Sequence, residues 1–204
     1  MEKTAWQDEK ICDLILNRNF PHIMHSDHFN SLHSCVEKIQ DSKKLIDMGC
    51  GNAEFGDIYK HIDYTGADLP HIIEKVALAQ RPNFNYVKFD MFKDDLKFLG
   101  DYDVILINAF ISEMKNPIDI LSKILYHSKK YVIIHRQDVG EESRLEKYTP
   151  YESSLIATNC VILEQDLHKA IEKSGFDMIH ICNSFEGLDS KKTFLLERKN
   201  DSTF

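Results

Sequence analysis

The order of apolar and polar positions predicts an α/β fold. From residue 43 onward, short apolar runs alternate with segments whose apolar residues recur at helical spacing, which is typical of strand–helix–strand units and a parallel sheet. The predicted strands cover residues 44–48, 64–68, 85–89, 102–108, 130–135, 177–183 and 192–198. The predicted helices cover residues 52–61, 70–80, 117–127 and 164–174. We therefore expect a doubly wound, mostly parallel sheet of seven strands.

The lengths of the connections predict the strand directions. The first five predicted strands are separated by enough chain for crossovers, whereas about eight residues join the last two. A link that short predicts an antiparallel hairpin, so the last strand should run against the others. Residues 138–160 have no clear periodicity, and we expect them to form a long insertion, which in a compact domain is usually a functional loop or lid.

The first 42 residues predict a helical cap. Apolar residues recur at helical spacing between residues 5 and 18, where Pro21 ends the helix, and again between residues 29 and 39. Four histidines lie between these stripes, and together with Asp27 they raise the alternative of a metal site: His22, His25, His28 and His33. Pro21 and the possible caps Ser26 and Asp27 favour a loop that leads into a helix instead, so we expect no metal.

Composition and charge narrow the class of protein. The chain of 204 residues fits one domain, and its five cysteines are widely spaced without a C-x-x-C pair, which favours a reducing cytoplasm over a disulfide framework or a zinc ribbon. The N-terminus lacks an apolar signal segment, and no stretch is long enough to span a membrane. A net charge of −8 disfavours nucleic acid as a partner. We interpret basic pairs such as Lys191-Lys192 as solvated surface, and the oligomeric state stays open.

A glycine turn follows the first predicted strand. Residues 43–56 read KKLIDMGCGNAEFG, in which an apolar run containing Asp47 enters Gly49-Cys50-Gly51, and Asn52 can cap the next helix. Glycine permits both the tight turn and a close approach of backbone N–H groups to a ligand. The stretch therefore predicts a site for a nucleotide-like molecule.

Two acids end the next two predicted strands. Asp68 lies 17 positions after Gly51, where a carboxylate can accept hydrogen bonds from ribose hydroxyls, or alternatively cap the helix that begins at Leu69-Pro70. Asp90 ends the third strand and is followed by Met91, a pairing that suits an adenine amino group and the ring face. Ligands of open α/β sheets bind at the carboxyl ends of the strands, which is where these acids are expected.

This ordered set resembles the class I S-adenosylmethionine-dependent methyltransferases over roughly residues 30–198. Asp47, Gly49 and Gly51 match the acidic and glycine motif of that family, whose third glycine is replaced by Ala53. The resemblance implies a Rossmann-like sheet of seven strands with the last antiparallel. It also implies S-adenosylmethionine as cofactor and S-adenosylhomocysteine as product, with the ribose on Asp68 and the adenine on Asp90 and Met91. We place Cys50 and Leu69 in the same cofactor site.

The resemblance divides the single domain into a cap (1–42), a cofactor-binding half (43–137), an insertion or lid (138–163) and a C-terminal helix and hairpin (164–204). An NAD(P)-dependent oxidoreductase is the alternative with the same turn, but its G-x-G-x-x-G motif needs glycine where Glu54 stands. A binding or regulatory subunit without catalysis is a second alternative, which Ala53 keeps open.

Methyl transfer mainly requires alignment of the acceptor, together with a base that takes its proton. His135 ends the fifth predicted strand and is our candidate base, although it could be an ordinary hydrogen-bonded histidine. Asn108 ends the fourth and could face the methionine part of the cofactor, or it and Glu113 could cap the next segment. The prolines of the Asn/Asp-Pro-Pro-Tyr/Phe motif, found in enzymes that methylate nucleobase or glutamine amino groups, are absent here.

Four residues predict the acceptor site. Arg136 and Gln137 lie next to the candidate base and could bind an anionic or hydroxyl-rich molecule, while Tyr148 and Tyr151 of the insertion could close over it. The HRQD stretch with a tyrosine-bearing loop is faintly similar to methyltransferases that act on sugars. We therefore predict a cytoplasmic enzyme that methylates a small hydroxyl- or amine-bearing molecule.

Overall fold

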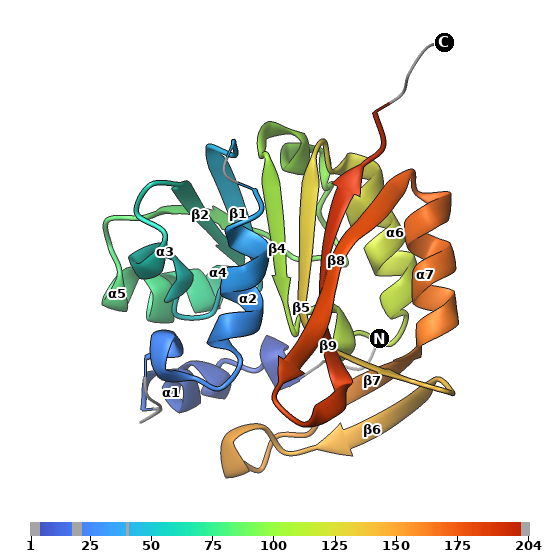
Figure 1. Ribbon diagram of the computed structural model, residues 1–204. Coiled ribbons are helices and arrows are strands. Elements are labelled where there is room, and N and C mark those ends of the chain that lie inside the picture. The colour runs from blue at the N-terminus through green and yellow to red at the C-terminus, as the bar shows by residue number, and fades with distance from the viewer. Residues whose placement is uncertain (1–4, 18–21, 40, 201–204) are drawn as a thin grey trace.

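The computed structural model describes residues 5–17, 22–39 and 41–200. Within them, nine strands form a sheet whose order is β3-β2-β1-β4-β5-β7-β6, with β9 also paired to β5 and β8 to β9 (Figure 1). The strands are β1 (Lys44–Met48), β2 (Asp63–Asp68), β3 (Asn85–Lys88), β4 (Val104–Asn108), β5 (Tyr131–Gly140), β6 (Arg144–Tyr148), β7 (Ala157–Leu163), β8 (Phe176–Phe185) and β9 (Leu188–Arg198).

The five neighbouring strands β3, β2, β1, β4 and β5 are parallel, and their residues pair with little offset. Leu45 of β1 lies opposite Tyr64 of β2 and Val104 of β4, so the carboxyl ends of these strands reach the same edge of the sheet. The last strand, β9, pairs antiparallel with both β5 and β8. The predicted fold class is confirmed, and the final pair is the predicted hairpin.

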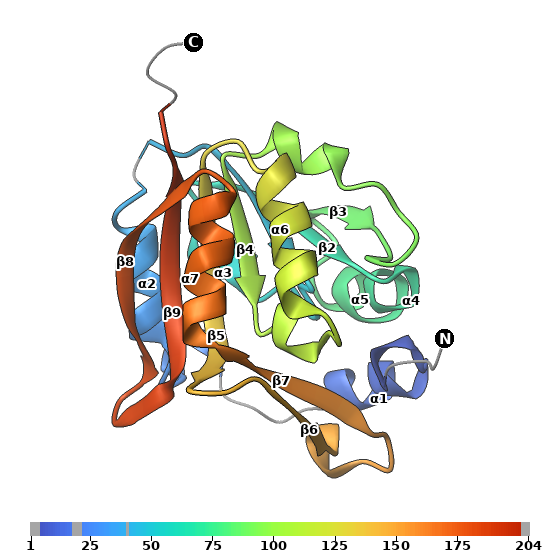
Figure 2. The same ribbon diagram turned by 90° about the vertical axis from the view of Figure 1, so that its right-hand side faces the viewer.

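Helices cover both faces of the sheet because successive strand residues point to opposite sides. Ile46 and Ile105 pack on the side of α6 (Pro117–His127) and α7 (Glu164–Lys173). Leu45 and Leu106 pack on the other side, under α2 (Phe29–Val36) and α3 (Phe55–Ile58). The predicted helix over 70–80 consists of α4 (Pro70–Ile72), a π-helical turn (Ile73–Ala77) and α5 (Leu78–Gln80). The layers are visible in Figure 2.

The insertion contains two strands that form a hairpin, which the sequence did not predict. Strand β5 continues to Gly140, and β6 then pairs antiparallel with β7, which lies parallel to the end of β5. Sequence periodicity did not reveal β6 because four of its five residues are exposed and the fifth is half-buried, so no apolar alternation marks it. The predicted helix over 52–61 is shorter, since α3 begins at Phe55 and Asn52 does not cap it.

The first helix of the N-terminal cap lies at the same end of the sheet as this hairpin, beyond the carboxyl ends of the parallel strands, whereas α2 covers a face of the sheet (Figures 1 and 2). This first helix, α1 (Lys10–Leu16), packs Ile11 and Ile15 against Ile72 and Val76. Pro21 and residue 18, the end of the predicted first helix, lie outside the described residues. No helix in the described part of the chain has the length and apolar character of a membrane span.

Phe194 provides a test of the role of β9, because its side chain is fully buried and its strand lies between β5 and β8. We expect Phe194→Ala to lower the free energy of unfolding by about 3–5 kcal/mol, since it removes a buried aromatic ring and leaves a cavity. Tyr126→Ala is the control, because that ring is 79% exposed and its loss should cost less than about 0.5 kcal/mol. Denaturant titration measures both, and equal losses would contradict the assigned packing.

Candidate cofactor and acceptor site

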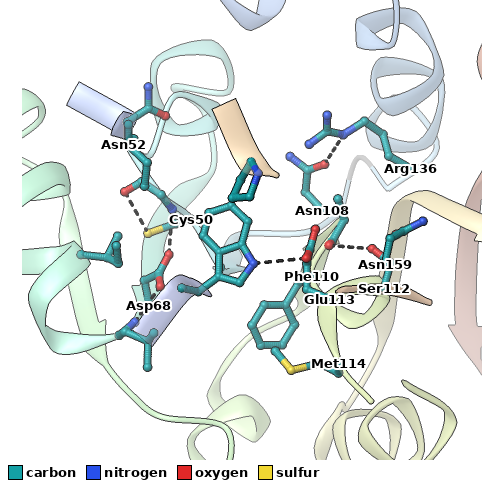
Figure 3. A pocket seen from close by; sticks show the side chains of 18 of the residues that line it. Cys50, Asn52, Asp68, Asn108, Phe110, Ser112, Glu113, Met114, Arg136 and Asn159 are labelled. Carbon is teal, nitrogen blue, oxygen red and sulfur yellow. Dashed lines mark hydrogen bonds between the residues drawn. The ribbon is translucent and has the colours of Figure 1, made fainter. Parts of the chain in front are cut away.

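A cavity of about 770 Å³ opens at the carboxyl ends of the parallel strands, between the sheet, the cap and the insertion. This volume lies within the range of small-molecule sites, roughly 300–1,000 Å³. In Figure 3, Cys50, Asn52 and Asp68 lie at one end, and Asn108, Glu113, Arg136 and Asn159 lie at the other. The lining includes eleven of the residues predicted for the site: Gly49, Cys50, Gly51, Asp68, Leu69, Asp90, Met91, Asn108, Arg136, Tyr148 and Tyr151.

The glycine turn is tied to the end of β2 through its backbone. The N–H groups of Gly49 and Cys50 both donate to the carbonyl of Ala67, at 2.8 and 3.2 Å. Gly49 has a φ of 74°, and a Cβ there would lie 2.7 Å from the ring of Phe110. This position therefore requires glycine for both its conformation and its contact.

Ala53 occupies the place of the third glycine without disrupting the turn. It has a φ of 60°, in the left-handed region that glycine enters at lower cost, and its side chain is fully buried. The substitution therefore preserves the glycine-like backbone conformation.

Asp68 receives two backbone hydrogen bonds at the end of β2. The N–H of Gly51 donates to its Oδ2 at 2.9 Å, and the N–H of Leu69 donates to its Oδ1 at 2.7 Å. Burial raises the pKa of Asp68 to about 6 despite these two bonds, which favour the carboxylate. The N-cap position of α4 is Leu69, so Asp68 does not occupy the capping position that the alternative interpretation proposed.

Asp90 lies at the far side of this end of the cavity, with Met91 beside it in the lining. Its Oδ1 accepts from the N–H of Phe92 at 3.0 Å and its Oδ2 from the Lys93 ammonium at 2.7 Å. Burial acts to raise the pKa of Asp90, but these hydrogen bonds outweigh it and hold the pKa below the usual range. Asp90 is therefore an anionic acceptor at neutral pH.

Asp47, which was predicted as part of the cofactor site, lies behind the turn and does not line the cavity. Its Oδ2 accepts from the hydroxyl of Tyr64 at 2.8 Å, while its Oδ1 is buried without a hydrogen-bond partner among the described residues. Burial raises the pKa of Asp47 to about 7. Strand alternation explains this placement, because Met48 packs into the core on the α6 side and the Asp47 side chain therefore points the opposite way, toward Tyr64 of β2.

A side-chain hydrogen bond joins the end of β4 to the middle of β5. Nε of Arg136 donates to Oδ1 of Asn108 at 2.8 Å, and both residues line the cavity (Figure 3). Arg136 has a φ of 57°, and the pairing of β5 with β9 shifts register between Ile134 and Gln137. This bulge directs the Arg136 side chain into the cavity.

His135 and Gln137 do not line the cavity, so the predictions that they reach the acceptor were wrong. Both side chains are fully buried. Because β5 continues past residue 135, His135 lies within the strand on the face that α2 covers, where Nδ1 contacts Oγ1 of Thr193 at 2.8 Å. Nε2 of Gln137 donates to the carbonyls of Asp138 and Cys160, at 2.8 and 3.5 Å.

Glu113 connects the cap to the insertion across the cavity. Nε1 of Trp6 donates to its Oε2 at 3.2 Å, and the hydroxyl of Tyr148 donates to its Oε1 at 2.5 Å. Burial raises the pKa of Glu113 despite these two bonds. Tyr151 packs edge-on against Trp6, with ring centroids 6.3 Å apart. Glu113 therefore does not act as the helix cap that was its alternative role, since its carboxylate accepts from two distant segments.

Several lining residues were not predicted from the sequence. Nζ of Lys191 and Nδ2 of Asn159 both donate to Oδ2 of Asp138, at 2.6 and 3.0 Å, and both line the cavity. Lys191, which was interpreted as solvated surface, is half-buried and also belongs to the lining. His28 also lines the cavity. In the described part of the chain, no group of three or more His, Cys, Asp or Glu residues is arranged to hold a metal ion.

A glycine turn and acids at the carboxyl ends of parallel strands are typical of α/β proteins that bind nucleotide-like ligands. The family model for a methyltransferase domain matches residues 20–181, and the chain belongs to this family. The match confirms the family predicted from the turn and the two acids. No curated protein sequence matches the chain.

Solved structures with the same fold have little sequence identity to the chain. The sugar N-methyltransferase KedS8 from Streptoalloteichus sp. is 12% identical, with 98% of this chain and 96% of that chain covered and a TM-score of 0.65. The N-terminal domain of EvdMO1, in the presence of SAH and D-fucose, is 12% identical, with 97% and 99% covered and a TM-score of 0.62. SAM-bound CalS10, an amino pentose methyltransferase from Micromonospora echinaspora, is 11% identical, with 98% and 100% covered and a TM-score of 0.61.

The buried carboxyl of Asp47 predicts a dependence of stability on pH. Its pKa rises from 3.8 to about 7 on folding, so its stabilising contribution is complete below pH 3.8 and is lost as the pH rises through 7. Relative to the wild type, Asp47→Asn should therefore gain about 1 kcal/mol of unfolding free energy for each pH unit between 5 and 7. Denaturant titrations at several pH values measure this difference. Parallel curves for the two proteins would show that Asp47 is ionised in the fold.

Glu113 predicts a local effect on the cap and the insertion. Glu113→Ala leaves two half-buried donors, Trp6 and Tyr148, without their acceptor, and hydrogen bonds to charged groups contribute about 1.5–3 kcal/mol each. We expect backbone amides in α1 and β6 to exchange hydrogen at least about tenfold faster, as measured by mass spectrometry. Glu146→Ala is the matched control, because Glu146 also lines the cavity but pairs with Arg144 of its own strand. Equal exchange in both variants would contradict the connecting role.

Proposed function

We propose that the protein transfers the methyl group of S-adenosylmethionine to a hydroxyl or amine of a small molecule. The observation that carries this proposal is the series of ligand-facing groups along one sheet edge, from the glycine turn through Asp68 and Asp90 to Asn108. Membership of the methyltransferase family supports the reaction, and the neighbours crystallised with SAM or SAH support the cofactor.

The groups at the β2 and β3 end suit the adenosine half of the cofactor. We assign the ribose hydroxyls to Asp68, whose carboxylate oxygens can accept further hydrogen bonds beside the two backbone donors. We assign the adenine to Asp90 and Met91, which offer an anionic acceptor and an apolar side chain. Gly49, Cys50, Gly51 and Leu69 provide the wall between them.

The other end of the cavity suits a polar acceptor. Arg136, Asn159 and Lys191 line it and provide donors that match hydroxyl or anionic groups. Tyr148 also lines it, and its hydroxyl oxygen is an acceptor because its proton is donated to Glu113. The fold is shared with proteins described as a sugar N-methyltransferase and an amino pentose methyltransferase, which supports a sugar as the acceptor class. The cap (1–42) and the insertion (138–163) form the lid in this proposal, and Tyr151 closes it against Trp6.

The reaction needs few catalytic groups. The acceptor oxygen or nitrogen forms a bond to the methyl carbon as the carbon–sulfur bond breaks, and the electron pair of that bond stays on sulfur as a neutral thioether. Alignment and exclusion of water are the main contributions that the protein makes to such a displacement. The enclosure of the cavity by Glu113 and its two partners serves this purpose.

Calorimetry with S-adenosylhomocysteine tests the cofactor site. Asp68→Asn should weaken binding by roughly 10- to 100-fold, since hydrogen bonds to a charged acceptor contribute about 1.5–3 kcal/mol. Wild-type affinity should also fall as the pH drops through about 6, where Asp68 becomes protonated and loses acceptor capacity. Asp63→Asn, at the exposed opposite end of β2, is the matched control and should bind normally.

Two outcomes would contradict this proposal. Failure to bind either S-adenosylmethionine or S-adenosylhomocysteine, together with binding of NAD(H), would favour the oxidoreductase alternative. Binding without methyl transfer to any of a broad panel of amino and hydroxy sugars would favour a binding or regulatory role.

A further inference from the structure

We propose that His28 takes the proton from the acceptor, and that His135 and Thr193 are positioning residues that fix the tautomer of its ring. This inference rests on the proposed function, because it assigns the base of that reaction. It replaces the predicted base, His135, with a histidine that lines the cavity.

Contacts on two sides orient the ring of His28. Its Nδ1 lies 3.0 Å from Nε2 of His135, and the ring of Phe185 packs edge-on with centroids 5.5 Å apart. His28 directly precedes α2, while His135 and Phe185 belong to β5 and β8. The ring is therefore positioned by three elements of the fold, at the wall of the cavity.

A chain of hydrogen bonds sets the direction of proton donation. The hydroxyl of Ser31 donates to the carbonyl of His28 at 2.8 Å, and the hydroxyl of Thr193 donates to Oγ of Ser31 at 3.3 Å. With its proton used in this way, Oγ1 of Thr193 is an acceptor toward Nδ1 of His135 at 2.8 Å. His135 therefore carries its proton on Nδ1.

The direction of hydrogen-bond donation is the same between His135 and His28. His135 is neutral, because burial lowers its pKa well below the usual value and the charges of Arg136 and His28 act in the same direction. A neutral imidazole has one N–H, so Nε2 of His135 must accept a hydrogen bond from Nδ1–H of His28. Neutral His28 then has its proton on Nδ1 and its lone pair on Nε2. This tautomer can accept a proton at Nε2, as a general base must.

The proton transfer balances with the methyl transfer. As the acceptor's O–H or N–H nucleophile forms its bond to carbon, its proton passes to Nε2 of His28 and leaves an imidazolium. The hydrogen bond from Nδ1 to the neutral ring of His135 stabilises this cation without a second proton transfer.

Nitrogen NMR of the ¹⁵N-histidine-labelled full chain tests the tautomers without any ligand. We expect the Nδ1–H form for both His28 and His135 in the wild type, assigned by comparison with His28→Gln. Thr193→Val removes the acceptor for Nδ1–H of His135 and should shift that ring toward the Nε2–H form. An Nε2–H form of His28 in the wild type would overturn the proposal.

The second test measures the rate of methyl transfer from S-adenosylmethionine to a panel of amino and hydroxy sugar nucleotides. His28→Gln should lower kcat by about 100-fold or more while the affinity for S-adenosylhomocysteine stays within about twofold. His25→Gln, an exposed histidine of the same segment, is the matched control and should leave kcat unchanged. A kcat of His28→Gln equal to that of the wild type would overturn the base assignment. Failure of the wild type to bind the cofactor would instead contradict the proposed function.

Discussion

The site depends on the hydrogen bonds that join the glycine turn to the end of β2. Three consecutive N–H groups, those of Gly49, Cys50 and Gly51, donate to the carbonyl of Ala67 and the carboxylate of Asp68. Buried peptide donors need partners, so the turn can adopt its left-handed backbone only because the neighbouring strand supplies acceptors. The same carboxylate then faces the cavity. The side chain of Asp68 therefore both supports the turn and makes the proposed contact to the ribose.

The residues that line the β2 and β3 end of the cavity were predictable because each is marked by its own stretch of sequence. Each acid follows directly after an apolar run, and the parallel register brings the ends of β1, β2 and β3 to one edge without any need to know the rest of the fold. Gly49 is specified by its own conformation and by Phe110. Asp47 shows the limit of this reasoning, because the motif identified it correctly but only the structure places it behind the turn.

The acceptor end was not predictable in the same way because its contacts are distant in sequence. Trp6 meets Glu113, and His28 meets His135, across 107 residues in both cases. His135 was misplaced because the strand continues beyond it, and the bulge at Arg136 then decides which side chain faces the cavity. No periodicity in the sequence reports such a bulge. The exposed residues of β6 likewise gave no pattern.

Substitutions at the two ends of the cavity are expected to have different effects on the fold. The cofactor end uses backbone groups and acids of adjacent parallel strands, so a substitution there also alters the turn that holds the sheet edge together. The acceptor end is assembled from the cap, the end of β4 and the insertion, which meet through side chains such as Glu113 and Tyr148. Residues of β6 can vary without changing the core, because most of that strand is exposed. The residues of the proposed acceptor end can therefore vary while the turn and the sheet edge are retained. The chain itself shares its fold with solved structures to which it is only 10–14% identical.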